Sequence, residues 1–323
     1  MKYDMITIGD IKLDTFVVLE DASVQCSLKM PECQLCLDYG KKIPVNIVDS
    51  QIAGSAPNVA RGLARMKHKT AVVSVMGRDD THELAMEVLA HEGVGTKFIT
   101  TSTKAKSSYS VVLNYKGEKT ILTSHVPRKY RLPNIDGPHW LYMSELGDGY
   151  EDLFRDLTRL VRREKILLGF NPGAVQIRDR KKVLFDLIKV THLLVLNLHE
   201  AYTLTKGKTY EIHSLLRDLY RLGAEVVIIT NGKEGAHAFD GQTVYFCPVF
   251  PAKTVESTGV GDAFSTGVIG ALMAKLTLPE ALRWGAVNAA SVVSFVGPSK
   301  GLLSANQIKK RLKERPSFKT TTL

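Results

Sequence analysis

A glycine-rich turn that ends in a carboxylate lies late in this 323-residue chain. Its residues are Thr258, Gly259, Val260, Gly261 and Asp262, and a segment rich in small and apolar residues follows. Two glycines around one residue allow a sharp turn that exposes consecutive backbone N–H groups, and such donors at a helix start attract an anion. Asp262 is then interpreted either as a helix cap or as a general base that takes a proton from a hydroxyl group while the N–H groups stabilise phosphoryl charge.

Two other phosphate-binding motifs are excluded. A P-loop would require Gly at position 202, which is Tyr202, and the dinucleotide fingerprint would require Gly at position 264, which is Phe264. The zinc-protease pattern is absent, because none of the three His-Glu pairs is followed by His at the required position. The turn before Asp262 is therefore favoured as an anion hole of another kind.

The elements that must position this turn alternate along the chain. Apolar strands are predicted at 3–9, 71–76, 140–143, 166–170, 193–196 and 226–230. Helices are predicted at 57–67, 81–92, 152–163, 176–189, 211–222, 261–274, 279–296 and 304–313. This alternation predicts a single doubly wound α/β domain over residues 1–323, with a mostly parallel sheet, helices on both faces and a ligand crevice at the carboxyl ends of the strands. We expect the tail beyond Pro316 to be frayed.

Two insertions, at about 15–50 and 105–125, interrupt the alternation. The first is predicted to be irregular over 17–49, and the second has the pattern of a β-hairpin. We expect both to pair into a small β-sheet that acts as a lid over one end of the main sheet. Alternating apolar residues on the second insertion could lie against a nucleobase or pack on the partner strand; they are Tyr109, Val111, Leu113 and Tyr115.

Three of the four cysteines fall in the first insertion. Cys33 and Cys36 have the spacing of a zinc knuckle, and Cys26 could supply a third thiolate, but no fourth ligand stands at a matching spacing. Unliganded thiols and a disulfide are the alternatives.

The composition places limits on partners. The net charge is +10, but the basic residues are spread over predicted helix faces and are not interleaved with aromatic residues, so binding to nucleic acid is not expected. Charged residues interrupt the N-terminal segment, and no apolar run reaches the ~20 residues that a membrane span needs. We expect a cytoplasmic protein that binds small molecules.

Five motifs resemble those of the ribokinase-like (PfkB-type) family of sugar and nucleoside kinases. In chain order they are Gly9-Asp10 with Asp14, residues 53–60 (AGSAPNVA), residues 197–200 (NLHE), residues 230–235 (TNGKEG) and residues 256–262 (ESTGVGD). The family patterns are a first strand with a substrate-binding Asp, Gly-Gly-x-x-x-Asn-x-Ala, Asn-x-x-Glu, Thr-x-Gly-x-x-Gly and Asp-Thr-x-Gly-Ala-Gly-Asp. The resemblance implies an ATP- and Mg²⁺-dependent kinase that phosphorylates a hydroxyl of a small sugar or sugar derivative. A nucleoside kinase is the alternative, and a non-catalytic sugar or nucleotide sensor on the same fold is a more distant one.

The resemblance also implies a role for each matching residue. Asp262 would be the base, and Gly259, Val260 and Gly261 would supply the N–H groups of the anion hole. Asn197 and Glu200 would hold Mg²⁺ through water. The residues implied for the substrate are Asp14, Gly54, Ser55 and Asn58, and those implied for the nucleotide are Asn197, Thr230, Gly232, Gly235 and Asn288.

The chain departs from the family patterns at several positions. Glu256 and Ser257 replace Asp and Thr where many members hold a monovalent cation, which leaves activation by potassium open. Val260 replaces Ala and Ala53 replaces Gly. Because relatives often dimerise through the lid, a homodimer is a further expectation. No motif names the acceptor.

Overall fold

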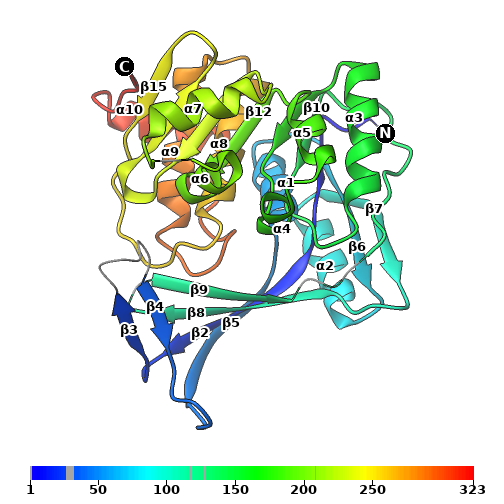
Figure 1. Cartoon of the computed structure of the whole chain (residues 1–323), viewed down its shortest axis with the longest axis vertical. Coiled ribbons are helices and arrows are strands. Elements are labelled where there is room, and N and C mark those ends of the chain that lie inside the picture. The colour runs from blue at the N-terminus through cyan, green and yellow to red at the C-terminus, as the bar shows by residue number, and fades with distance from the viewer. Residues whose placement is uncertain (1, 27–32, 117, 125, 127, 208) are drawn as a thin grey trace.

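The computed structural model describes the whole chain except residues 1, 27–32, 117, 125, 127 and 208 (Figure 1). The strands of the main sheet are β1 (Met5–Ile8), β6 (Thr70–Gly77), β7 (Val94–Ser102), β10 (Trp140–Met143), β11 (Leu167–Phe170), β12 (Leu193–Asn197), β13 (Val226–Thr230), β14 (Ala236–Phe239), β15 (Val244–Cys247) and β16 (Thr321–Thr322). Their order in space is β16-β15-β14-β13-β12-β11-β10-β1-β6-β7. All neighbours from β13 to β7 are parallel, and β14, β15 and β16 add antiparallel strands at one edge.

Helices cover both faces of this sheet (Figure 1). They are α1 (Ser55–Arg65), α2 (Asp80–His91), α3 (Glu151–Glu164), α4 (Ala174–Asp179), α5 (Lys182–Ile188), α6 (Leu198–Thr205), α7 (Ile212–Arg221), α8 (Val260–Met273), α9 (Leu278–Val292), α10 (Ala305–Glu314) and the short 3₁₀ helix η1 (Gly232–Glu234). Successive strand residues point to opposite faces, so Leu141 and Met143 pack with α3, α5 and α7, whereas Trp140 and Tyr142 pack with α1, α8 and α9. This two-sided burial explains why the strands are apolar runs. It confirms the predicted doubly wound fold.

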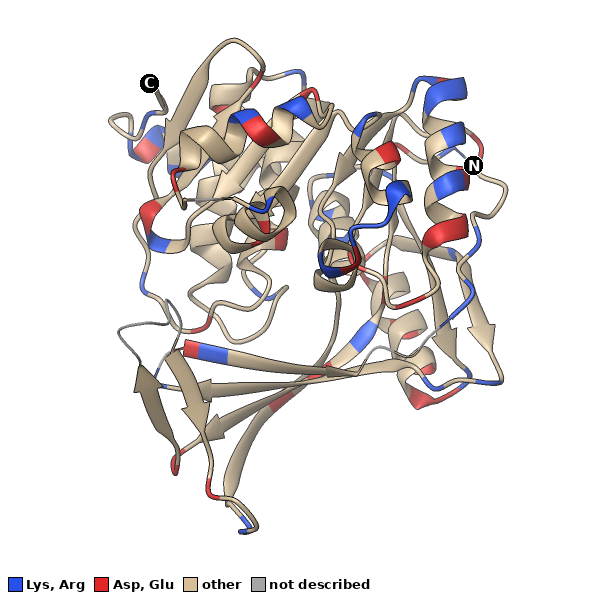
Figure 2. Cartoon of the chain, viewed as in Figure 1, with Lys and Arg blue, Asp and Glu red and all other residues tan. Residues whose placement is uncertain are grey.

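The Lys and Arg residues lie mainly on the solvent side of the helices, as Figure 2 shows for α3. Several of them pair with an acidic residue one turn away on the same helix, such as Arg159 with Asp156 at 3.0 Å. None of the described helices is both long and apolar enough to cross a membrane.

A second, smaller sheet lies across one end of the molecule (Figure 1). Its strands are β2 (Lys12–Leu19), β5 (Val45–Ala53), β8 (Ser108–Tyr115) and β9 (Glu118–Ser124), in the order β5-β2-β8-β9. Ser108, Ser110 and Val112 are buried on one face of β8, and Tyr109 on the opposite face is 40% exposed. The hydroxyl of Tyr109 donates to Thr15 Oγ1 at 2.9 Å on the neighbouring strand. Tyr109, Val111, Leu113 and Tyr115 thus lie on the face away from Ser110, which supports packing rather than a contact with a nucleobase.

Three predictions about secondary structure were wrong. The segment 17–49 is not irregular, because β2 and β5 extend into it from both ends. The predicted helix at 176–189 is two helices, separated at Arg180, whose backbone is left-handed (φ 48°). The tail beyond Pro316 is not frayed: Phe318 packs against Phe250, and β16 pairs with β15.

The zinc site predicted at Cys26, Cys33 and Cys36 is contradicted. Cys26 and Cys33 face each other across the hairpin of β3 (Ser23–Cys26) and β4 (Cys33–Cys36), and they form a disulfide. Two of the three thiolates are therefore not available to a metal, and Cys36 remains a free cysteine. In the described part of the chain, no group of three or more His, Cys, Asp or Glu is arranged to hold a metal ion.

Candidate active site

Polar residues gather where the parallel strands of the main sheet end. Asp10 follows β1, Glu145 follows β10, Asn197 ends β12 and Thr230 ends β13. Because these strands are parallel, all four residues lie at the same side of the sheet, along the carboxyl ends of its strands. This is the side at which sequence reasoning placed the ligand crevice.

The start of α1 brings two of the predicted motifs together. Gly54 has φ 119° and ψ 147°, and a Cβ atom there would collide with the backbone carbonyl of Asp10, so only glycine fits. From this start, one turn of helix places Asn58 so that its Nδ2 donates to Asp262 Oδ2 at 2.7 Å. Residues 204 positions apart in the sequence thus form one site.

The start of α8 holds the glycine turn. Gly259 is left-handed (φ 73°) and Gly261 is exposed, and Asp262 lies in the first turn of the helix. The carboxylate of Asp262 accepts hydrogen bonds from the side chains of Asn58 and Ser55 on α1. The N-cap residue of α8 is Gly259, so Asp262 does not occupy the capping position. The geometry therefore favours the general-base interpretation of Asp262 over the capping one.

Burial raises the pKa of two neighbouring carboxyl groups of the site, those of Asp262 and Asp14. Burial raises the pKa of Asp262, although the bonds from Asn58 and Ser55 act in the opposite direction. Burial also raises the pKa of Asp14 to about 6, and the charge of Lys12 opposes this shift. A base with a raised pKa is a better proton acceptor near neutral pH than an ordinary aspartate.

Lys12 and Glu145 belong to this cluster, and sequence reasoning missed both. Lys12 Nζ donates to Glu145 Oε1 at 2.6 Å, and both side chains are largely buried. Burial alone would lower the pKa of Lys12, but the charges of Glu145 and Asp14 outweigh it and raise that pKa. Lys12 stands two residues before Asp14 on the same face of β2, a spacing that could have revealed it.

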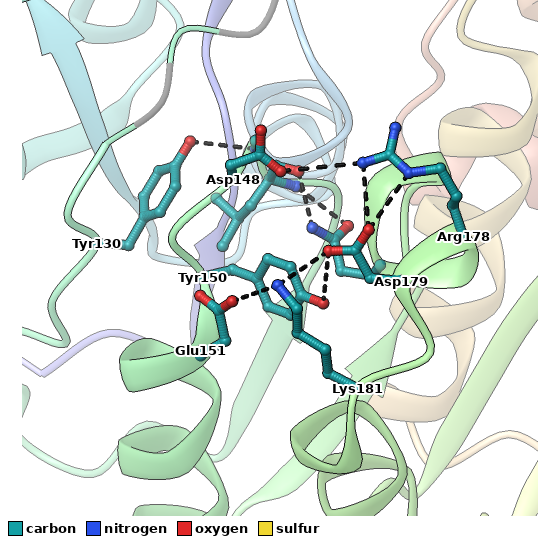
Figure 3. Close-up of polar contacts among 10 residues, drawn as sticks. Tyr130, Asp148, Tyr150, Glu151, Arg178, Asp179 and Lys181 are labelled. Atoms are coloured by element: carbon teal, nitrogen blue, oxygen red, sulfur yellow. Dashed lines mark hydrogen bonds and ion pairs between the residues drawn. The ribbon is translucent and has the colours of Figure 1, made fainter.

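The loop that carries Glu145 is anchored on both sides. Gln176 on α4 accepts from Leu146 N at 3.5 Å and donates to Leu146 O at 2.8 Å. The hydroxyl of Tyr130 donates to Asp10 Oδ1 at 2.8 Å and accepts from Gly147 N at 3.2 Å. Figure 3 shows how the same loop continues into a network of ion pairs and hydrogen bonds made by Asp148, Tyr150, Glu151, Arg178, Asp179 and Lys181. The contacts of Gln176 and Tyr130 hold the residues that follow Glu145 beside Asp10.

Asn197 and Glu200 cap the start of α6 with each other. Glu200 N donates to Asn197 Oδ1 at 2.8 Å, and Asn197 N donates to Glu200 Oε2 at 2.9 Å. Burial raises the pKa of Glu200 to about 7; the charges of Glu145 and Asp262 act in the same direction, and the bond from Asn197 opposes them. Carboxyl groups that raise one another's pKa suit a divalent cation, so the residues present fit Mg²⁺ held through water.

Comparisons with known proteins assign the chain to a family. Residues 16–305 match the family model described as pfkB family carbohydrate kinase. The chain belongs to the pfkB family. Its members are kinases that transfer a phosphoryl group from ATP to a hydroxyl acceptor, and this chain is therefore a phosphotransferase of that type.

Individual relatives of this pfkB-family kinase are distant. The chain is 22% identical over 289 residues to 5-dehydro-2-deoxygluconokinase from Geobacillus kaustophilus, which covers 81% of this chain and 85% of the relative. The ribokinase of Arabidopsis thaliana, solved with ribose and ATP, superposes with a TM-score of 0.78 at 18% identity and covers 97% of this chain and 99% of that one. The nucleoside kinase of Burkholderia thailandensis, solved with inosine, gives a TM-score of 0.75 at 15% identity, with 98% and 99% covered. These two structures support the fold.

Asn288 of this pfkB-family kinase was predicted to bind the nucleotide, and the structure places it in the interior of the protein. Asn288 is fully buried, and its Nδ2 donates to Ala263 O at 2.7 Å while its Oδ1 accepts from Leu303 N at 2.9 Å. The Nδ2 end thus joins α9 to the first turn of α8, and the Oδ1 end joins α9 to the segment before α10. Both polar ends of the side chain are used within the protein, and a contact of Asn288 with the nucleotide stays a prediction. Thr230, Gly232 and Gly235 lie in the turn between β13 and β14, at the same side of the sheet as Asn197.

Glu256 of this kinase organises the glycine turn at residues 258–261 (the anion turn). Its Oε1 accepts from both Thr258 N and Thr258 Oγ1 at 2.6 Å, and its Oε2 accepts from Gly297 N at 3.3 Å. The carboxylate is 4% exposed. The longer side chain at this position thus joins the turn before α8 to the loop after α9.

We expect Asp14→Asn to change how stability depends on pH. The folded-state pKa of Asp14 lies above its unfolded value, so this group contributes stability at low pH that is lost as the pH rises through about 6. Between pH 5 and 8 the wild-type free energy of unfolding should fall by roughly 1–1.5 kcal/mol more than that of Asp14→Asn. Urea unfolding of both proteins at the two pH values measures the difference, and parallel pH profiles would contradict the raised folded-state pKa of this carboxyl group.

Proposed function

We propose that this kinase transfers the γ-phosphoryl group of ATP to a hydroxyl of a small sugar or sugar derivative bound between the small sheet and α1. The observation that carries this proposal is a pair of buried acceptor atoms. Among the described residues, Asp14 Oδ1 and Asn58 Oδ1 have no hydrogen-bond donor. A buried acceptor without a donor costs about 1–3 kcal/mol, and the adjacent hydroxyls of a sugar would satisfy both atoms. Gly54 and Ser55 complete this side of the proposed substrate site.

In the proposed reaction, Asp262 acts on the acceptor hydroxyl. The hydroxyl oxygen forms a bond to the γ-phosphorus as its proton passes to the Asp262 carboxylate, and the bond from that phosphorus to the β–γ bridging oxygen breaks. The backbone N–H groups of Gly259, Val260 and Gly261 stabilise the charge on the transferring group. Asn58 holds the carboxylate of Asp262 in place through the 2.7 Å hydrogen bond.

Asn197 and Glu200 would hold the magnesium ion through its water molecules. When bound, Mg²⁺ neutralises charge on the phosphates. Thr230, Gly232 and Gly235 would contact the nucleotide, since they lie beside Asn197 at the same side of the sheet.

A phosphoryl-transfer screen with ATP and Mg²⁺ tests the proposed function. The acceptors are pentoses, hexoses, sugar acids, sugar phosphates and nucleosides, and Asp262→Asn is the inactive control. We expect turnover of a sugar or sugar derivative. A nucleoside as the preferred acceptor would contradict the proposed substrate class, and nucleotide binding without turnover of any acceptor would favour a sensor.

We also propose that the kinase acts in the cytoplasm on small molecules and forms a homodimer through the small sheet. Large apolar side chains are exposed on its strands; they are Val45, Ile47, Val48, Tyr109 and Leu122. Burying them against a second copy would also cover the open edges of the sheet. We expect Leu122→Lys to shift wild-type dimers to monomers in sedimentation velocity, whereas Leu167→Lys, at the exposed start of β11 in the main sheet, leaves the dimer intact. A monomeric wild-type protein would contradict this proposal.

A further inference from the structure

Lys119 lies on β9, outside the residues assigned so far to the base, the anion hole, the substrate and the nucleotide. In the register of the small sheet, Lys119 is opposite Asn114 on β8, and Asn114 is in turn opposite Val18 on β2. Residues directly opposite one another lie on the same face of a sheet, and residues two apart share that face as well. Lys119 therefore points to the same side of the sheet as Asp14, which is the side of the proposed substrate site.

Most of the charges near Lys119 come from the catalytic side of the molecule. The carboxylates of Glu256, Asp262 and Asp14 act on it from that side, and Glu118 acts on it from the same strand. Glu256 holds the anion turn, and Asp262 is the proposed base. Together with the register of the strands, these charges place Lys119 on the side of the small sheet that faces the anion turn and the proposed base.

The ammonium group of Lys119 has no close partner. It forms no ion pair or hydrogen bond with any of the described residues, although its side chain is partly buried. Burial lowers the pKa of Lys119 even though the four carboxylates act in the opposite direction. A lysine that has lost water without gaining a counter-ion is suited to bind an anion that arrives with the substrates.

The small sheet that carries Lys119 is fixed to the support of the anion turn. Lys300 Nζ donates to Asp49 Oδ2 at 2.7 Å, and Gln51 Nε2 donates to Val296 O at 3.5 Å. Both contacts join β5 to the loop after α9, and that loop also donates Gly297 N to Glu256. These contacts hold the β5 edge of the small sheet against the loop that supports the anion turn.

We propose that Lys119 is a catalytic residue of the kinase reaction, whose ammonium binds an oxygen of the transferring γ-phosphoryl group. This inference rests on the proposed function. Lys119 keeps its proton throughout: the acceptor proton goes to Asp262, and the electron pair of the breaking bond stays on the β-phosphate oxygen of ADP. Lys119 stabilises charge opposite the N–H groups of the anion turn, so the transferring group is held from both the body and the small sheet.

Kinetics of Lys119→Gln and Lys119→Arg, with the acceptor found in the screen, test this role. We expect kcat of Lys119→Gln to fall by roughly 10²-fold, with both KM values within about threefold of wild type, and Lys119→Arg to recover part of the loss. The matched control is Lys116→Gln, which removes the same charge from an exposed residue in the turn between β8 and β9 and should leave kcat unchanged. A kcat within about threefold of wild type for Lys119→Gln would overturn the proposal. If KM for the acceptor rose while kcat stayed unchanged, Lys119 would bind an anion on the acceptor itself, and the proposal would be overturned in favour of that role.

A binding measurement separates this role from a structural one. Aluminium fluoride with ADP, Mg²⁺ and the acceptor mimics the phosphoryl group in transfer. We expect Lys119→Gln to lose roughly 10²-fold in affinity for this complex and to bind ADP with Mg²⁺ as tightly as wild type. Equal losses for both ligands would mean a structural role and would overturn the proposal. If wild type transferred no phosphoryl group to any acceptor, the proposed function would fail first, independently of any Lys119 variant.

Discussion

Replacing Asp262 by Asn is expected to lower kcat by roughly 10²–10⁴-fold, the size of a general-base contribution. The amide has the shape of the carboxylate and can still accept the hydrogen bond from Asn58 Nδ2, so the site keeps its arrangement. It cannot take the acceptor proton. Steady-state kinetics with the acceptor from the screen give kcat, and calorimetric titration with ADP and Mg²⁺ is expected to give a dissociation constant close to that of wild type.

The control for the lost charge is Asp240→Asn. Asp240 lies in the turn between β14 and β15, at the opposite edge of the main sheet from Thr230, and accepts hydrogen bonds from Gln242 N, Thr243 N and the hydroxyl of Tyr245. We expect this variant to retain wild-type kcat. If Asp262→Asn turned over at nearly the wild-type rate, Asp262 could not be the base.

The residues of the candidate site that sequence reasoning identified lie in short contiguous motifs. The glycines of the turn at 259–261 have a local physical reason that can be seen in the sequence, whereas Asn197 and Glu200 were identified by the resemblance, and the structure adds that they cap α6. The parallel strands were also predictable, because burial on both faces makes them apolar runs. In both cases neighbouring residues determine the structure.

The features that sequence reasoning missed depend on long-range contacts. Lys12 and Glu145 form their ion pair across 133 positions, and Asn288 meets its partners on two separate elements. The small sheet was expected, but the extent of β2 and β5 within the first insertion was missed because their inner faces carry polar residues such as Asp14 and Gln51, which obscure the apolar alternation. The tail beyond Pro316 becomes a strand only because β15 offers it an edge. A polar residue assigned by resemblance to a ligand can thus have its side chain used within the protein.

Gly54→Ala is expected to lower kcat/KM by at least roughly 10²-fold, because a displacement of about 1 Å in a site has an effect of that order. The φ of 119° is open to glycine alone, and the added Cβ would meet the carbonyl oxygen of Asp10. Either the loop after β1 or the start of α1 must move. The loop carries Asp10, which is bonded to Tyr130, and the helix carries Asn58, which holds Asp262. Either movement disturbs the site.

The matched control for Gly54→Ala is Gly93→Ala. Gly93 follows α2 with φ 76°, and a Cβ atom there would meet no atom within 4 Å. It should therefore show only the cost of a left-handed alanine, about 1 kcal/mol in urea unfolding, with kcat/KM unchanged. Kinetics and unfolding of both variants separate backbone strain from displacement of the site. Equal kcat/KM values for the two variants would show that the close approach of Gly54 to Asp10 has no part in aligning Asn58 with Asp262.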